Sequence, residues 1–193
     1  MQLFCSILRH NYSTKLEVTQ EQLIKKCQQN DDEARRELYL RYGKIMYGVC
    51  CRYIKDRVEA EDVLHDGFIT LFTKIKLYRF EGSFEGWCRR IFINTALTHL
   101  REKNPLLDAS NVDEQNSLSN KEASVVDQIS AQDLTNIIDK LPEGYKTIIN
   151  LYAVEGYSHK EIGEMLDISE NTSRSQYSRA RAKLSQLLLD YEK

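Results

Sequence analysis

Apolar residues recur at steps of three and four along most of this 193-residue chain, which is the spacing of one face of an α-helix. Only two prolines and eight glycines interrupt the pattern. No segment shows the strict alternation of apolar and polar residues that is typical of a half-buried β-strand. We therefore expect an all-α fold, built at this length as one domain or two small ones.

Four helices are expected in the first half of the chain, after a tail at residues 1–18. Thr19 and Gln22 form a capping box for a helix reaching about residue 30. A second helix follows from Asp32, a third spans about 58–76, and a fourth follows a loop at 78–87 and ends near residue 103. The apolar residues expected to face the core are Leu38, Tyr42, Ile45, Val49 and Tyr53, then Leu64, Phe68, Leu71 and Ile75, then Ile93, Ala96, Leu97 and Leu100.

The composition changes after Lys103. Pro105 ends the preceding helix, and residues 104–124 are rich in asparagine, serine and acidic side chains. We interpret this segment as a flexible linker between a domain at 19–103 and a domain at 125–193. A long surface loop within a single domain is the alternative.

The second domain contains the sequence pattern of a helix-turn-helix. Ser158 and Glu161 form a second capping box, a tight turn follows, and Ser169 is a suitable N-cap for the next helix. Gly163 is small enough for the point where two such helices cross. A short helix, a tight turn and a second helix make a helix-turn-helix.

The second helix of this motif is cationic, with no acidic residue between 171 and 183. In a helix-turn-helix, the N-terminal residues of this helix reach base edges in the major groove, and cations further along contact phosphates. The expected DNA contacts are Asn171, Thr172, Arg174, Ser175 and Gln176 at bases and Arg179, Arg181 and Lys183 at phosphates. A solvated basic face is the alternative. Because the net charge is −2, DNA binding would depend on segregated charge.

A second candidate nucleic-acid surface lies around the start of the fourth helix. The aromatic residues Phe80, Phe84 and Trp87 precede a polar row on that helix, formed by Arg90, Asn94, Thr98 and Arg101. Aromatic rings stack on unpaired bases while arginines hold phosphates. Aromatic core residues beside a solvated polar row are the alternative.

Several classes of protein fit the sequence poorly. The five cysteines include no C-x-x-C pair, so we expect reduced thiols in the core, with a zinc site of Cys50, Cys51 and a distant histidine as the alternative. No apolar run approaches the roughly 20 residues of a membrane-spanning helix. Residues 1–8 make a poor signal peptide, so we expect a cytoplasmic protein that is not inserted in a membrane. We expect no cofactor, no metal, no small-molecule substrate and no enzymatic activity.

Three segments together resemble a known family over most of the chain. Residues 60–72 (AEDVLHDGFITLF), 87–103 (WCRRIFINTALTHLREK) and 141–184 (from LPEGYK to RARAKL) are similar, in this order, to regions 2 and 4 of bacterial sigma factors. The chain is identified as a member of the sigma-70 family, in its extracytoplasmic-function (ECF) class. The resemblance implies a subunit that binds core RNA polymerase, reads the −35 and −10 promoter elements and assists promoter melting.

The resemblance also implies roles for individual residues. Asp62, His65 and Asp66 would bind a coiled coil of the largest polymerase subunit. Phe80, Phe84 and their neighbours would capture a base flipped from the non-template strand, and Arg90, Asn94 and Arg101 would contact DNA around the melting point. Region 4, with Arg174, Ser175 and Gln176, would read the −35 element. A membrane-anchored anti-sigma factor is a further partner that the family implies.

Three residues depart from the family pattern. Thr98 stands where aspartate is common, Asp167 where the turn has glycine, and Ser173 where valine or isoleucine is buried. The hydroxyl of Ser173 therefore needs a local partner. The main alternative function is a stand-alone transcriptional regulator that dimerises on a two-fold DNA site. An enzyme, for which His65–Asp66 or Asp31–Asp32 would be the candidate residues, and a protein-only adaptor fit the sequence less well.

Overall fold

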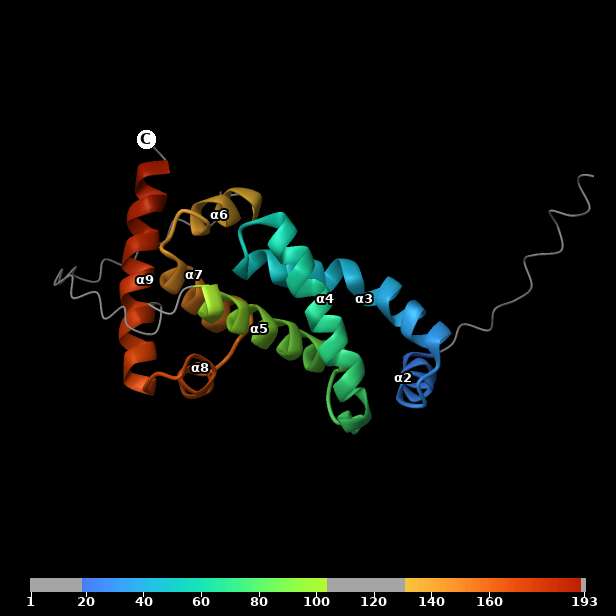
Figure 1. Ribbon diagram of the computed structural model, residues 1–193. Helices are drawn as coiled ribbons and strands as arrows, with labels where there is room; N and C mark the ends of the chain where they lie inside the picture. The colour runs from blue at the N-terminus through green and yellow to red at the C-terminus, as the bar shows by residue number, and fades with distance from the viewer. Residues whose placement is uncertain (1–18, 104–130, 192–193) are drawn as a thin grey trace, which may run out of the picture.

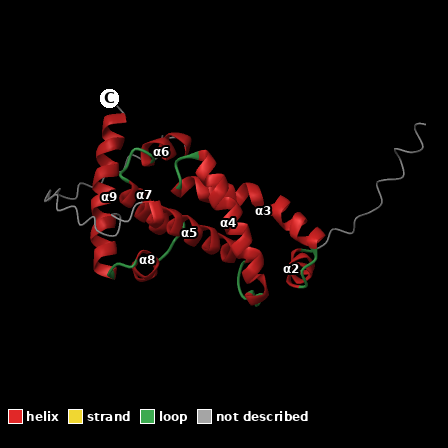
Figure 2. Ribbon diagram, in the orientation of Figure 1, coloured by secondary structure: helices red, strands yellow, loops and turns green. Residues whose placement is uncertain are grey.

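The computed structural model describes residues 19–103 and 131–191, and every regular element in these ranges is helical (Figure 2). The expected tail at 1–18 and the expected linker at 104–124 lie outside the described residues, as does residue 125, where the second domain was expected to begin. The all-α prediction is confirmed for the part of the chain that is described. Within that part, no helix has the combination of length and apolar character needed to cross a bilayer.

The N-terminal unit packs α3, α4 and α5 around one core, with α2 against one end of α3 (Figure 1). The Thr19–Gln22 capping box begins its first helix as predicted, and Asp31 and Asp56 cap the next two. Its elements are α2 (Gln20–Gln28), α3 (Asp32–Tyr53), α4 (Arg57–Lys74), the 3₁₀ turn η1 (Ile75–Leu77) and α5 (Phe84–Lys103).

The crossing of α4 and α5 depends on one glycine. A Cβ atom at Gly67 would lie 2.4 Å from the ring of Phe92, which is fully buried and packs edge-on against Phe68. Any side chain at this position would push the two helices apart. The apolar residues expected in the core of α4 and α5 are all buried.

Two expectations for this unit were wrong. Ile45 is 41% exposed, and its neighbour Met46 is buried instead, because the core face of α3 is rotated by one residue at this point. The expected loop at 78–87 ends early, since the Ser83 hydroxyl accepts a hydrogen bond from the Gly86 N–H and the helix already begins at Phe84.

The C-terminal unit places three short helical segments beside one long helix, α9, which stands at the edge of the molecule in Figure 1. Its elements are α6 (Ala131–Ile138), α7 (Glu143–Ile149), the π-helical turn η4 (Asn150–Val154), α8 (His159–Leu166) and α9 (Glu170–Tyr191). The sequence predicted a helix through Leu151 but not the π turn that ends it. Gly156, with φ of +77°, then turns the chain toward α8.

The two units share one continuous hydrophobic core. Ile148, Leu151 and Ile162 of the C-terminal unit belong to the same buried cluster as Phe92 and Leu97 of the N-terminal unit. The described residues therefore form two helical units that are packed against each other, with α5 reaching into the C-terminal unit (Figure 1).

Candidate nucleic-acid interface

Helices α8 and α9 form the helix-turn-helix that the sequence predicted. Ser158 and Glu161 make their reciprocal capping box, and the Ser169 hydroxyl accepts a 3.0 Å hydrogen bond from the Thr172 N–H at the start of α9. Asp167 takes the left-handed conformation, with φ of +56°, that explains why glycine is usual there. A Cβ atom at Gly163 would lie 2.7 Å from the Ile168 carbonyl oxygen, so only glycine fits this crossing.

The cationic residues of α9 point away from the core, while Ala180 is buried on the opposite face. The residues predicted to contact DNA that are exposed are Asn171, Arg174, Ser175, Arg179, Arg181 and Lys183, and those that are half-buried are Thr172 and Gln176. Arg174 forms an exposed ion pair with Glu170 one turn earlier. Such a surface pair is weak, so the guanidinium can exchange its partner for a DNA group at little cost.

Ser173 has the local partner that its hydroxyl requires. Its Oγ lies 2.9 Å from Nδ1 of His159, and both side chains are buried between α8 and α9. The imidazole also stacks on Tyr152, with ring centroids 4.3 Å apart. Burial lowers the pKa of His159, and the nearby Arg174 lowers it further, so the pair is held with a neutral imidazole. The sequence flagged Ser173 but not its partner.

The three aromatic residues predicted near the melting point lie in one cluster but differ in access. Phe80 is 39% exposed at the tip of the loop before α5, with a positive φ of 62°. Phe84 is 3% exposed and stacks on Trp87, which is half-buried. The ring of Phe84 packs against Tyr78 and Tyr42 beneath the loop, so Phe80 is the more accessible of the two predicted base contacts.

The polar row on α5 is only partly open to solvent. Arg90 and Asn94 are exposed, whereas Arg101 donates a hydrogen bond to the backbone carbonyl of Met165 in α8. Arg90 lies close enough to Glu161 to assist the hydrogen bonds from Ser158 that lower the pKa of this carboxyl. The side of α5 that was predicted to face DNA is therefore turned partly toward the C-terminal unit.

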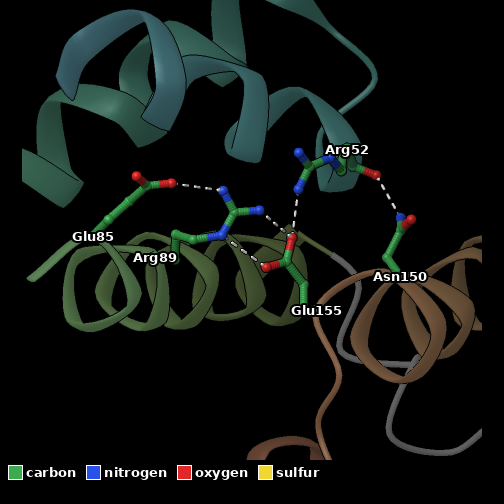
Figure 3. Close-up of polar contacts among 5 residues, drawn as sticks. All are labelled: Arg52, Glu85, Arg89, Asn150 and Glu155. Atoms are coloured by element: carbon green, nitrogen blue, oxygen red, sulfur yellow. Dashed lines mark hydrogen bonds and ion pairs between the residues drawn. The ribbon is translucent and has the colours of Figure 1, made fainter. Parts of the chain in front are cut away.

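Glu155 makes a buried polar contact between the two units (Figure 3). Its carboxylate is only 4% exposed and binds Arg89 through two hydrogen bonds, Nε to Oε2 and one terminal nitrogen to Oε1, both 3.1 Å. Arg52 pairs with the same Oε1. Burial acts to lower the pKa of Arg89, but the hydrogen bonds that Arg89 donates to Glu155 and the charge of this carboxylate raise it overall.

The π turn also brings Asn150 to Arg52, the arginine of α3 that pairs with Glu155. Asn150 Nδ2 donates a 3.0 Å hydrogen bond to the carbonyl of Arg52, and the Glu155 N–H donates to the carbonyl of Asn150. Residues five apart lie above each other in a π turn, so both side chains reach Arg52. We call Arg52, Glu85, Arg89, Asn150 and Glu155 the Glu155 network; Glu85 contributes a 3.6 Å contact to Arg89.

The three residues predicted to bind polymerase are exposed, and because they lie three and four residues apart they share one face of α4. His65 borders a shallow groove between α3 and α4, where Leu40 is 67% exposed. Asp66 instead borders a polar groove between α4 and α5, beside Asn94. The structure thus brings Asp66 next to a predicted DNA contact.

The cysteines among the described residues are free thiols, and Cys27, Cys50 and Cys88 are buried. Burial raises the pKa of Cys27 to about 11 and that of Cys50 to about 12, so both remain protonated at neutral pH. Within residues 19–103 and 131–191, no three histidine, cysteine or acidic side chains come together as a set that could hold a metal ion.

Comparison with known proteins supports the resemblance seen in the motifs. Residues 38–105 match the family "Sigma-70 region 2", and residues 131–184 match "Sigma-70, region 4". The ECF RNA polymerase sigma-E factor of Haemophilus influenzae is 32% identical over 176 residues, covering 86% of this chain and 93% of the relative. The ECF RNA polymerase sigma factor SigW of Bacillus subtilis is 29% identical, covering 91% of this chain and all of the relative.

The fold is also found in a solved structure. The sigma factor RpoE of Bartonella quintana, crystallised in complex with the anti-sigma factor NepR, superimposes with a TM-score of 0.52 at 19% identity, covering 79% of this chain and 95% of RpoE. From its two matched regions, its helix-turn-helix and its relatives, the chain belongs to the ECF RNA polymerase sigma factors of the sigma-70 family.

Proposed function

We propose that this sigma factor directs core RNA polymerase to promoters by reading the −35 element with α9 and the −10 element with the Phe80 loop and α5. It would act as a non-enzymatic subunit in the cytoplasm. Its two units would engage two promoter elements at once, so that two weak contacts act together through the chain that links them.

The observation that carries this proposal is the exposed cationic face of α9 in a well-formed helix-turn-helix. Arg174 and Ser175 lie in the first two turns of α9, where a recognition helix meets base edges. Arg179, Arg181 and Lys183 lie further along the same helix and are exposed, as phosphate contacts must be. The buried His159–Ser173 pair holds this helix on α8.

The groove between α3 and α4 is the surface we assign to core polymerase. It offers an exposed apolar residue, Leu40, and half-buried aromatic rings of Tyr39 and Tyr47 beside the exposed His65. Asp62 is exposed nearby on α4, and its charge suits a basic partner helix. Asp66, placed beside Asn94, borders both this surface and the DNA-facing side.

An anti-sigma factor is a further proposed partner. RpoE of Bartonella quintana, which shares the fold, was crystallised with the anti-sigma factor NepR. We expect this chain to be held by a comparable protein, anchored in a membrane as the family resemblance implies, until core polymerase displaces it.

The first test is reconstitution with bacterial core RNA polymerase. The wild-type chain is expected to co-elute with the core enzyme in gel filtration and to drive transcription from a subset of a random-fragment promoter library. Arg174→Ala should leave co-elution intact and weaken use of the −35 element by about 1–3 kcal/mol, because it removes one base contact. Lys55→Ala, which removes an exposed cation outside both surfaces, is the matched control.

Two results would argue against the proposal. Elution of the chain alone, or as a homodimer that binds duplex DNA without polymerase, would favour a stand-alone regulator. Equal loss of transcription in Arg174→Ala and Lys55→Ala would show that α9 contributes only general charge.

A further inference from the structure

The interface between regions 2 and 4 occupies two cations of α5. Glu155 binds Arg89, and the Met165 carbonyl accepts a hydrogen bond from Arg101. The side chains of Arg89 and Arg52 keep exposed fractions of 24% and 33%, so the network lies at the rim of the contact rather than deep in the core. In this arrangement, α5 cannot present all its cations to promoter DNA.

Arg89 and Arg52 bind the Glu155 carboxylate in the way that arginines bind a phosphate. Two N–H groups of Arg89 meet its two oxygens at 3.1 Å, and Arg52 approaches one of these oxygens from α3 (Figure 3). The planar guanidinium fork binds carboxylate and phosphate in the same two-pronged way. Two arginines from two helices of region 2 thus converge on a single anionic group.

If region 4 moved away, Arg52 and Arg89 of region 2 would be free to bind another anion in place of Glu155. Arg52 and Arg89 would then have only Glu85, at 3.6 Å from Arg89, as an acidic neighbour within the network. Partly buried cations that lose their counter-ion are costly, and an external anion removes that cost. The site lies on the same helix as Arg90 and Asn94, which we assign to the −10 region, so DNA would supply the anion.

Tyr53 lies beside the Glu155 network. The hydroxyl of Tyr53, next to Arg52 at the end of α3, is buried and has no hydrogen-bond partner in the described structure. The negative charge of Glu155 adds to the burial that raises the pKa of this hydroxyl, which places Tyr53 close to the network.

We propose that Arg52 and Arg89 form a phosphate-binding site for promoter DNA, which Glu155 occupies while regions 2 and 4 are packed together. The proposal rests on the proposed function, because it assumes that α5 contacts promoter DNA. Packing of region 4 then competes with DNA at this site, and the apparent affinity for DNA rises as the fraction of molecules in which the site is open rises.

The test uses the full chain without polymerase and a fluorescein-labelled forked DNA of mixed sequence, since phosphate contacts do not depend on sequence. Glu155→Gln should bind this probe about fivefold or more tightly than wild type, as measured by fluorescence anisotropy. Glu59→Gln is the matched control. It removes the same charge from an ion pair within region 2, with Lys103, and should leave affinity within about twofold.

Substitution of Arg89 distinguishes a phosphate-binding site from an ion pair that only holds the two units together. Arg89→Ala also breaks the Glu155 network, yet it removes the site, so it should not raise DNA affinity. In the Glu155→Gln background, adding Arg89→Ala should cancel the gain and lower the slope of log affinity against log salt by about 0.9, the value for one phosphate contact. Circular dichroism of each variant confirms that the compared proteins are folded.

Two results would overturn the proposal: no gain in Glu155→Gln over Glu59→Gln, or an equal gain in Glu155→Gln and Arg89→Ala. The second would mean that the network only holds the units together. Failure of the proposed function is a separate outcome, since wild-type chain that neither binds core polymerase nor drives transcription would refute it whatever the anisotropy shows.

Discussion

His159 and Ser173 place a hydrogen bond inside a helix-turn-helix, where apolar packing is the usual solution. The Nδ1–Oγ distance of 2.9 Å and the burial of both residues make each one the other's main polar partner. Ser173→Val should therefore leave the imidazole nitrogen unpaired and cost about 1–3 kcal/mol of unfolding free energy. Urea denaturation followed by circular dichroism measures this loss.

The double variant separates the hydrogen bond from the packing. His159→Leu combined with Ser173→Val removes both polar groups together, and replacing both partners with apolar ones is close to neutral. The double variant should therefore recover most of the stability lost in Ser173→Val. Ser178→Ala, an exposed serine of the same helix, is the control and should change little. Additive losses from the two single changes would show that the residues act independently.

At the scale of elements, the sequence predicted helices best where a capping residue precedes an apolar stripe. The caps at Thr19, Ser158 and Ser169 all form as expected. The start of α5 was missed although Ser83 is a good N-cap, because the aromatic residues beside it were interpreted as a loop. The π turn at 150–154 has no comparable signal, since it ends its helix and no later helical residues follow to show a shifted apolar spacing.

The candidate site was predictable on α9 and less so on α5. A cationic helix after a tight turn needs only local sequence to be recognised. The roles of Arg52 and Arg89 depend on Glu155, which lies 103 and 66 residues away along the chain. The sequence favoured the neighbouring Arg90 because it continues the polar row, and the pairing of Arg89 appears only once the two units are packed together.

At the loop before α5, the buried ring that supports the loop and the exposed ring proposed to contact DNA belong to different residues. The two roles can therefore be measured separately. Phe84→Ala should destabilise the chain by about 3–5 kcal/mol, because it empties a buried position among Tyr42, Tyr78 and Trp87. Phe80→Ala should keep the unfolding free energy nearly unchanged, since its ring is 39% exposed, and should slow promoter opening. Urea denaturation and polymerase-dependent transcription from a pre-melted template, compared with a duplex template, measure the two effects.

A pre-melted template is the internal control for the Phe80 change. If Phe80 captures a flipped base, the Phe80→Ala defect should be large on duplex DNA and smaller on DNA whose strands are already separated. A defect of equal size on both templates would mean that Phe80 acts elsewhere, for example through the 5.6 Å contact of its ring with Lys25.

The whole molecule is held together by a shared hydrophobic core and by the Glu155 network. Units coupled in this way should unfold together, so one transition is expected in urea. Trp87, the single tryptophan, reports on region 2 alone, whereas helical circular dichroism reports on both regions. In the wild type, the two signals should therefore change over the same range of urea concentration.

Glu155→Gln should uncouple the two signals. Breaking a buried ion pair costs about 3–5 kcal/mol, and we expect about 2–3 kcal/mol here because Arg52 and Arg89 keep part of their hydration. Region 4, which is smaller, should then unfold first, so circular dichroism should fall before Trp87 fluorescence changes. Glu59→Gln, whose ion pair lies within region 2, should keep the signals coincident. Coincident signals in Glu155→Gln would mean that apolar packing alone couples the regions, and DNA would then have to overcome that packing rather than displace one carboxylate.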